Sequence, residues 1–174
     1  PSSPTRRSSG LSDHQGRIAA QTSAGISVMT LENQQTVNQT FLPQQQAEHL
    51  LLSPDGSLLY ASEGRLLRVW QITAEGAQLR ETQTLNQRPQ SLHILTGGRT
   101  LLIQDAQGVQ QWFAIAGDKG PRLQRIHTFA NSEDALSIVP EPQRRVFATF
   151  NAAGEINLSA TNQQGPNSPH QLAP

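Results

Sequence analysis

The sequence predicts an all-β fold made of repeated, antiparallel, four-stranded units. Two tryptophans, Trp70 and Trp112, stand 42 positions apart, and residues 47–72 can be laid without a gap over the segment that begins at residue 89. Turn signals separate short apolar runs throughout, and a helical period of 3.6 is nowhere sustained over ten residues. A period near 40 with several short strands in each unit is typical of β-propeller blades.

Each repeat begins with two short apolar strands joined by a tight turn. In the clearest copy, residues 49–53 and 57–61 flank Pro54-Asp55-Gly56. Proline presets φ and glycine tolerates a positive φ, which a tight reversal requires. The other two copies are residues 91–95 with 99–103 and residues 135–139 with 144–150. The last copy has prolines in place of glycine and about two added residues, so we expect a longer turn there.

The second half of each repeat is a small turn with a glycine, followed by a strand that ends on a bulky residue. Four segments fit this pattern: residues 24–29, 63–70, 107–112 and 153–158. Alternating polar and apolar residues at 78–85 and 122–129 predict a fourth, half-buried edge strand. We expect boundaries between units near Gln46, Arg88 and Asn131.

Counting these halves gives four copies of the second half but three of the first, with residues 17–21 as one strand of the missing piece. The prediction is therefore about three to four WD40-like blades. Closed propellers usually have at least four blades. The sequence therefore leaves three possibilities: a piece of a larger propeller, an open arc, or a combination of two chains.

The two ends differ in composition from the repeats. Residues 1–16 are predicted to be a flexible N-terminal segment, residues 17–161 the propeller-like domain and residues 162–174 a flexible tail. The outermost stretches are rich in Pro, Ser, Gly and Gln, and such composition does not offset the entropy of ordering. Because the chain starts at Pro1 without a methionine, we expect it to be an excised or processed piece.

Composition excludes several classes of function. The 13 basic residues balance the 13 acidic ones and Lys119 is the one lysine, so we expect no nucleic-acid partner. There is no cysteine for a disulfide, a thiolate or a zinc finger. No apolar run approaches the roughly 20 residues of a membrane helix. The 22 glutamines are expected on the solvent faces of strands.

No set of residues predicts catalysis. His49 and His93 lie in the first strands of their blades, where we expect neighbouring groups to satisfy them. A metal site that joins both with a carboxylate is the alternative. His127 is expected to be exposed, Asp55 to serve its turn, and Asp105 and Glu63 to bond in the loops before the second-half turn.

Other polar and glycine-rich positions are expected to have structural roles. Glu133-Asp134 lacks a second carboxylate pair for acid-base chemistry. Gly97-Gly98 and residues 117–120 lack phosphate-loop spacing, so we expect hairpin turns. An anion site formed by converging arginines is less favoured than solvated arginines; these are Arg65, Arg68, Arg80, Arg88, Arg99, Arg122 and Arg125. We therefore expect no catalytic residue, no metal and no cofactor, and the sequence identifies no binding residue.

Three segments taken together resemble a known family. They are LLLSPDGSLLYASEGRLLRVWQI, SLHILTGGRTLLIQDAQGVQQWF and RLQRIHTFANSEDALSIVPEPQRRVFATFNAAGEINL. In this order they resemble the extracytoplasmic, propeller-like insertion between the first two membrane helices of the long form of bacterial phosphate ABC transporter permeases. The resemblance covers about residues 17–159. The motif of SPDG followed by a tryptophan strand also occurs in many WD40-like propellers.

The resemblance implies a periplasmic location and a non-catalytic interaction or regulatory role. Its implied partners are the membrane part of the parent permease and a periplasmic phosphate-binding protein. Because the membrane helices of that family are absent from this sequence, no residue of a transport pathway can be assigned. A propeller-fold hydrolase and a stand-alone protein-binding scaffold are the alternatives, the first on fold analogy alone.

Two structural expectations follow from the repeat. Trp70 and Trp112 should be largely buried between neighbouring blades, since each ends an apolar strand at the same repeat position. Three and a half blades leave an apolar face and a sheet edge uncovered, so we also expect self-association of the isolated domain.

Overall fold

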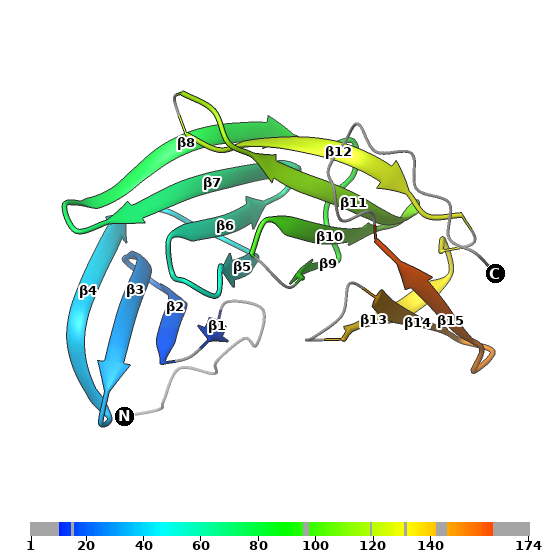
Figure 1. Cartoon of the computed structure of the whole chain (residues 1–174), viewed down its shortest axis with the longest axis horizontal. Coiled ribbons are helices and arrows are strands. Elements are labelled where there is room, and N and C mark those ends of the chain that lie inside the picture. Colours follow the sequence, from blue (N-terminus) through cyan, green and yellow to red (C-terminus); the bar gives the residue numbers. More distant parts are fainter. Residues whose placement is uncertain are drawn as a thin grey trace. The chain divides into compact units, whose positions relative to one another are not determined.

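The computed structural model describes residues 11–14, 16–95, 98–118, 120–130, 132–141 and 146–161. These residues form fifteen strands in four antiparallel sheets, and no helix occurs among them (Figure 1). The all-β prediction of about three to four blades is therefore confirmed. The strands belong to two compact units, Pro1–Asn86 and Gln87–Pro174.

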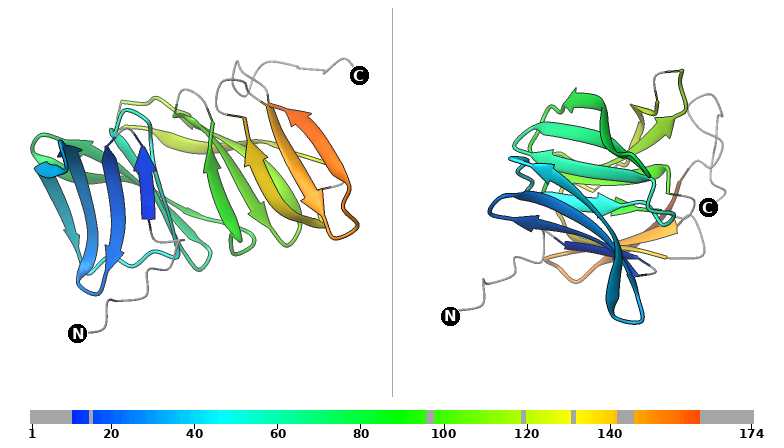
Figure 2. Two further views of the ribbon diagram at one scale, coloured as in Figure 1. Left: turned by 90° about the horizontal axis from the view of Figure 1, so that it is seen from below. Right: turned by 90° about the vertical axis from the view of Figure 1, so that its left-hand side faces the viewer.

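The first unit contains two four-stranded sheets, each with its strands in chain order (Figure 2). One sheet consists of β1 (Leu11–His14), β2 (Arg17–Thr22), β3 (Gly25–Glu32) and β4 (Gln35–Pro43). The other consists of β5 (His49–Leu52), β6 (Leu58–Glu63), β7 (Leu66–Thr73) and β8 (Gly76–Thr84).

The second unit also contains two sheets, of four and three strands. The four-stranded sheet consists of β9 (Ser91–Ile94), β10 (Thr100–Asp105), β11 (Gly108–Ile115) and β12 (Arg122–Thr128). The three-stranded sheet consists of β13 (Ala135–Pro140), β14 (Val146–Asn151) and β15 (Ile156–Ala160).

The first sheet is more complete than the sequence predicted. Residues 17–21 were expected to provide one strand of an incomplete unit, whereas β1 to β4 form four paired strands. β1 lies within residues 1–16. β4 escaped recognition because residues 35–39 are all solvent-exposed, so that strand has little apolar alternation.

The 42-residue register is visible in the backbone. The N–H of Ser53 donates to Leu58 O at 2.8 Å, and 42 positions later Leu95 N donates to Thr100 O at 2.9 Å. Trp70 pairs with Leu59 and Trp112 with Leu101, and a β-bulge adjoins each tryptophan. The two indoles therefore occupy equivalent positions in two blades.

The third copy of the first hairpin gains its extra length within a strand. The N–H of Glu141 donates to Val146 O at 3.0 Å, which encloses as many residues as the Ser53–Leu58 bond. The pairing of β13 with β14 shifts between Ala135 and Ser137, as a bulge does. The longer turn was expected at residues 140–143, of which 142 and 143 lie outside the described residues.

Each unit has its own apolar core between its two sheets. In the first unit Ala19, Ile26 and Leu42 of one sheet join Leu52 and Leu59 of the other. In the second unit the core consists of Leu95, Leu102, Val109, Ile138 and Phe147, with Phe129 packed against it. One blade cannot bury its face alone, so this pairwise stacking is what makes each unit stable.

Glutamine side chains reinforce this stacking. Gln21 and Gln104 are each the last residue but one of a second strand, β2 and β10. Gln21 Nε2 donates to Gln45 O at 3.1 Å and its Oε1 accepts from Ala47 N at 2.7 Å. Gln104 Nε2 donates to Ala135 O. Gln104 is buried, so the expectation that glutamines cover solvent faces is wrong here.

Candidate functional site

The two histidines of the hypothetical metal site lie in separate units, His49 in β5 and His93 in β9. His93 Nε2 is hydrogen-bonded to Ser91 Oγ at 3.1 Å, so a neighbouring side chain satisfies it. Among the described residues, no group of three or more His, Asp or Glu side chains could hold a metal ion. His127 is exposed, and its ring contacts the Phe129 ring edge-on, with the two ring centroids 4.7 Å apart.

The carboxylates of Asp55 and Asp105 serve turns, as their positions suggested. Asp55 Oδ1 accepts from Ser53 Oγ at 2.7 Å and from the N–H of Ser57 at 2.9 Å. The Ser53 hydroxyl, followed by the Ser57 donors, lowers the pKa of Asp55 against the opposing effect of partial burial. Asp105 Oδ1 accepts from the N–H of Gln107 at 2.8 Å.

Gly120, Asp134 and Arg80 also have local structural contacts. Gly120 N donates to Gly117 O at 2.9 Å, as in a tight turn, and Lys119 lies outside the described residues. Asn151 Nδ2 donates to Asp134 Oδ2 at 3.2 Å. Arg80 Nε donates to Gln71 Oε1 at 2.8 Å on the neighbouring strand. None of these contacts brings a nucleophile and a base together.

The two equivalent tryptophans differ in their surroundings. Trp112 is 6% exposed, and its Nε1 donates to Gln110 Oε1 at 3.1 Å. Gln110 Nε2 in turn donates to Asp105 Oδ2 at 2.9 Å. The prediction of a buried indole is therefore confirmed for Trp112.

Trp70 is less buried than Trp112, with an intermediate exposure, and it packs against the core of the first unit. Its Nε1 atom is itself buried and has no hydrogen-bond partner. The register explains this difference, because the residue two positions before Trp70 is Arg68, where the other blade has Gln110. A guanidinium group has donors only, so it cannot accept the indole N–H.

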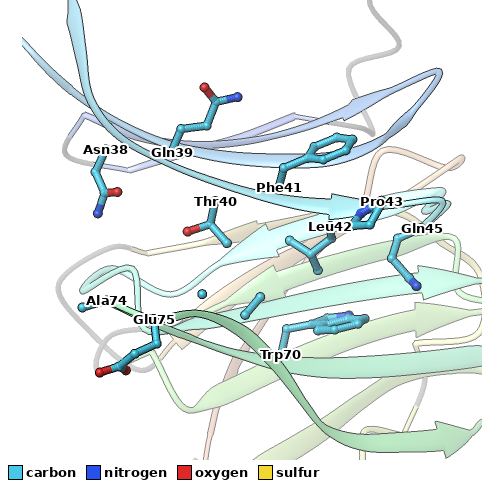
Figure 3. Close-up of a pocket in the computed structure, with 12 residues that line it drawn as sticks. Asn38, Gln39, Thr40, Phe41, Leu42, Pro43, Gln45, Trp70, Ala74 and Glu75 are labelled. Carbon is cyan, nitrogen blue, oxygen red and sulfur yellow. The ribbon is translucent and has the colours of Figure 1, made fainter.

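The indole of Trp70 lies at a groove of about 540 Å³ in the first unit (Figure 3). The edge strand β4 forms one side, and the β7–β8 hairpin forms the other. Glu75 is the one charged residue among those that line it. The lining residues are Asn38, Gln39, Thr40, Phe41, Leu42, Pro43, Gln45, Trp70, Ala74, Glu75, Gly76 and Ala77.

Sequence reasoning missed this groove because it did not recognise β4. Thr40 and Leu42 point toward the side of the groove where Trp70 lies, whereas Gln39 and Phe41 point away from it (Figure 3). Leu42 is buried in the core cluster against which Trp70 packs. The available sequence signal was the replacement of glutamine by Arg68 at the repeat position that supplies the indole's acceptor.

The described residues contain no helix of the length and hydrophobicity needed to cross a membrane. Comparison with known proteins finds no family model that matches the chain and no curated protein that matches it. Solved structures do match.

The WD40 domain of SCAP from fission yeast matches with a TM-score of 0.65 and 12% identity, over 92% of this chain and 44% of that chain. Hydrazine synthase from Kuenenia stuttgartiensis matches with a TM-score of 0.58 and 12% identity, over 91% of this chain and 48% of that one. The computationally designed Ika4 protein matches with a TM-score of 0.60 and 11% identity, over 92% of this chain and 94% of that chain.

At these identities the similarities show the fold alone, a WD40-like β-propeller fold. The chain spans less than half the length of the SCAP and hydrazine synthase chains.

Proposed function

We propose that this chain is a non-catalytic protein-interaction module that associates with a second copy of itself through the outward face of the sheet β13–β15. The supporting observation is an apolar surface on a structured sheet. Leu158 is 80% exposed and Ile156 is 60% exposed, and Val139 on β13 is half exposed. Large apolar residues that share one exposed sheet face favour a protein contact.

The strand register places these side chains on one face. Leu158 pairs with Ala148, which pairs with Val139, and Ile156 pairs with Phe150. Directly paired residues point to the same side of a sheet. The opposite side of β14 carries Phe147, which is buried in the core of the second unit. The sheet therefore has apolar residues on both faces, with one face covered by its neighbouring sheet.

A second copy is the occupant that the repeat architecture favours. In stacked repeats, each apolar sheet face is covered by the next unit. Since the chain matches 44% and 48% of two larger chains, two copies together have about the length of one such chain.

The experiment is static light scattering of the whole chain over a wide concentration range. Leu158→Lys should leave a monomer, because the contact would bury an unpaired charge. The matched control is Asn157→Lys, which adds the same charge on the adjacent exposed position and on the other face. The control should associate like the wild type. A monomeric wild type, or equal association of the two variants, would contradict the proposal.

The resemblance noted in the sequence supports a finer proposal. We propose that the module belongs to a phosphate-type ABC transporter permease, faces the periplasm, and contacts the membrane part of that permease or a phosphate-binding protein. Hydrophobic segments of membrane length on both sides of this chain in its parent gene are the expected result. The absence of such segments on both sides would remove the permease from the proposal and leave the interaction module.

A further inference from the structure

The groove beside Trp70 is a second surface, separate from the apolar face of β13–β15. All twelve of its lining residues belong to the first unit, whereas that apolar face belongs to the second. Its lining combines apolar groups with side-chain amides and a hydroxyl. Such a mixture, with a few directed polar groups in a concave site, is typical of binding sites.

One wall of the groove is a strand edge. β4 is the last strand of its sheet, and no described strand pairs with its outer edge. Six consecutive residues of it, 38–43, line the groove. An open edge offers a row of backbone donors and acceptors, which an extended peptide can join as an added strand.

The opposite wall contains Trp70, an aromatic surface on which an apolar side chain of a ligand can pack. Trp70 offers a half-buried aromatic surface, and Leu42 and Ala77 pack with it in the same core cluster. Its buried N–H lacks an acceptor, and an unsatisfied buried donor destabilises the free protein.

Charge distinguishes one end of the groove. Glu75 lies in the β7–β8 turn, is exposed, and has no basic residue beside it in the lining. A carboxylate at that position favours a ligand with a lysine or arginine at the corresponding end.

We propose that this groove binds an extended peptide segment of about five residues. The peptide pairs with the edge of β4, seats an apolar side chain on the Trp70 indole and places a basic side chain near Glu75. This inference deepens the proposed interaction function, but it does not require association between copies.

The test begins with a library of random twelve-residue displayed peptides, selected on the whole wild-type chain. Counter-selection uses Thr40→Arg, which puts a long side chain into the groove. The matched variant is Thr36→Arg, since Thr36 is exposed on β4 and does not line the groove. The thermal unfolding midpoints of both variants are compared first, so that a misfolded variant is recognised.

The expected peptides share one apolar position and one basic position at a constant spacing. The best synthetic peptide should bind the wild type and Thr36→Arg equally, and bind Thr40→Arg at least tenfold more weakly. Glu75→Gln should weaken it several-fold, whereas Glu32→Gln, at an exposed position on β3, should not. On the wild type, amide exchange should slow along β4.

Two further readouts separate this inference from the proposed function. In a Trp112→Phe variant, the remaining indole emission reports on Trp70 alone and should change when the peptide binds. Thr40→Arg should associate with a second copy like the wild type. No enrichment over the counter-selected variant, equal binding by Thr40→Arg, or slowed exchange confined to strands other than β4 would overturn the inference, whatever light scattering shows.

Discussion

The Trp112 indole donates to Gln110 at 3.1 Å across two positions of the same strand. The equivalent indole, Trp70, has Arg68 at the acceptor position and no hydrogen-bond partner for its Nε1. One substitution within a repeat thus separates a satisfied core tryptophan from one that lies at an open groove. The repeat provides the scaffold, and a departure from the repeat provides the candidate site.

Replacing Arg68 by Gln should stabilise the chain. The new side chain can accept the Trp70 N–H as Gln110 does for Trp112, which should raise the free energy of unfolding by about 1 kcal/mol. Urea unfolding followed by circular dichroism measures this change. Arg65→Gln, at an exposed turn position, is the control and should stay within about 0.5 kcal/mol of the wild type. A destabilised Arg68→Gln variant would contradict the explanation.

Replacing Gln104 by Ala should destabilise the second unit. The change removes the bond to Ala135 O and leaves Ser91 Oγ without its acceptor. Loss of buried partners of this kind costs about 1–3 kcal/mol. Gln78→Ala, at an exposed position on β8, is the matched control, and chemical unfolding of both variants is the measurement. Equal effects would show that the buried amide does not join the sheets.

Glycine is required at position 108 for space as well as for φ. Gly108 has φ +123°, and an added Cβ would lie 2.5 Å from Ser132 Oγ. Gly76 has nearly the same φ, +127°, with nothing within 4 Å of an added Cβ. Gly76→Ala should therefore show backbone strain alone, of about 1–3 kcal/mol. Gly108→Ala should show a larger loss, and thermal unfolding midpoints compare the two. A smaller loss at Gly108 would mean that Ser132 gives way freely.

Acid should weaken the turn at Asp55. Its folded-state pKa is lowered, chiefly by the Ser53 hydroxyl, so its contribution to stability is present above the unfolded-state pKa. That contribution is lost as pH falls from the unfolded-state pKa through the lowered folded-state value. Asp55→Asn should flatten the loss of unfolding free energy in this range, whereas Gln78→Ala, at an exposed position on β8, should not. An unchanged acid slope for Asp55→Asn would rule out this linkage.

The fold was largely predictable because the spacing of apolar residues and the types of turn residue recur in each repeat. Pro54-Asp55-Gly56 and the 42-residue register predicted paired strands where β5 to β7 and β9 to β11 occur. β4 could not be predicted, because an exposed edge strand does not need apolar alternation. The different environments of Trp70 and Trp112 were missed for a related reason. The alternation of apolar residues in a strand indicates which face is buried. The acceptor of an indole N–H depends instead on one residue, two positions earlier in the same strand.

The most direct test of the interaction account is amide hydrogen exchange of the wild-type chain at low and at high protein concentration. Light scattering establishes whether copies associate, and exchange shows which strands they use. We expect exchange in residues 135–141 and 146–160 to slow as concentration rises, since β13 to β15 carry the apolar face that a second copy covers. Exchange rates that do not depend on concentration, or slowing confined to strands outside β13–β15, would contradict the account.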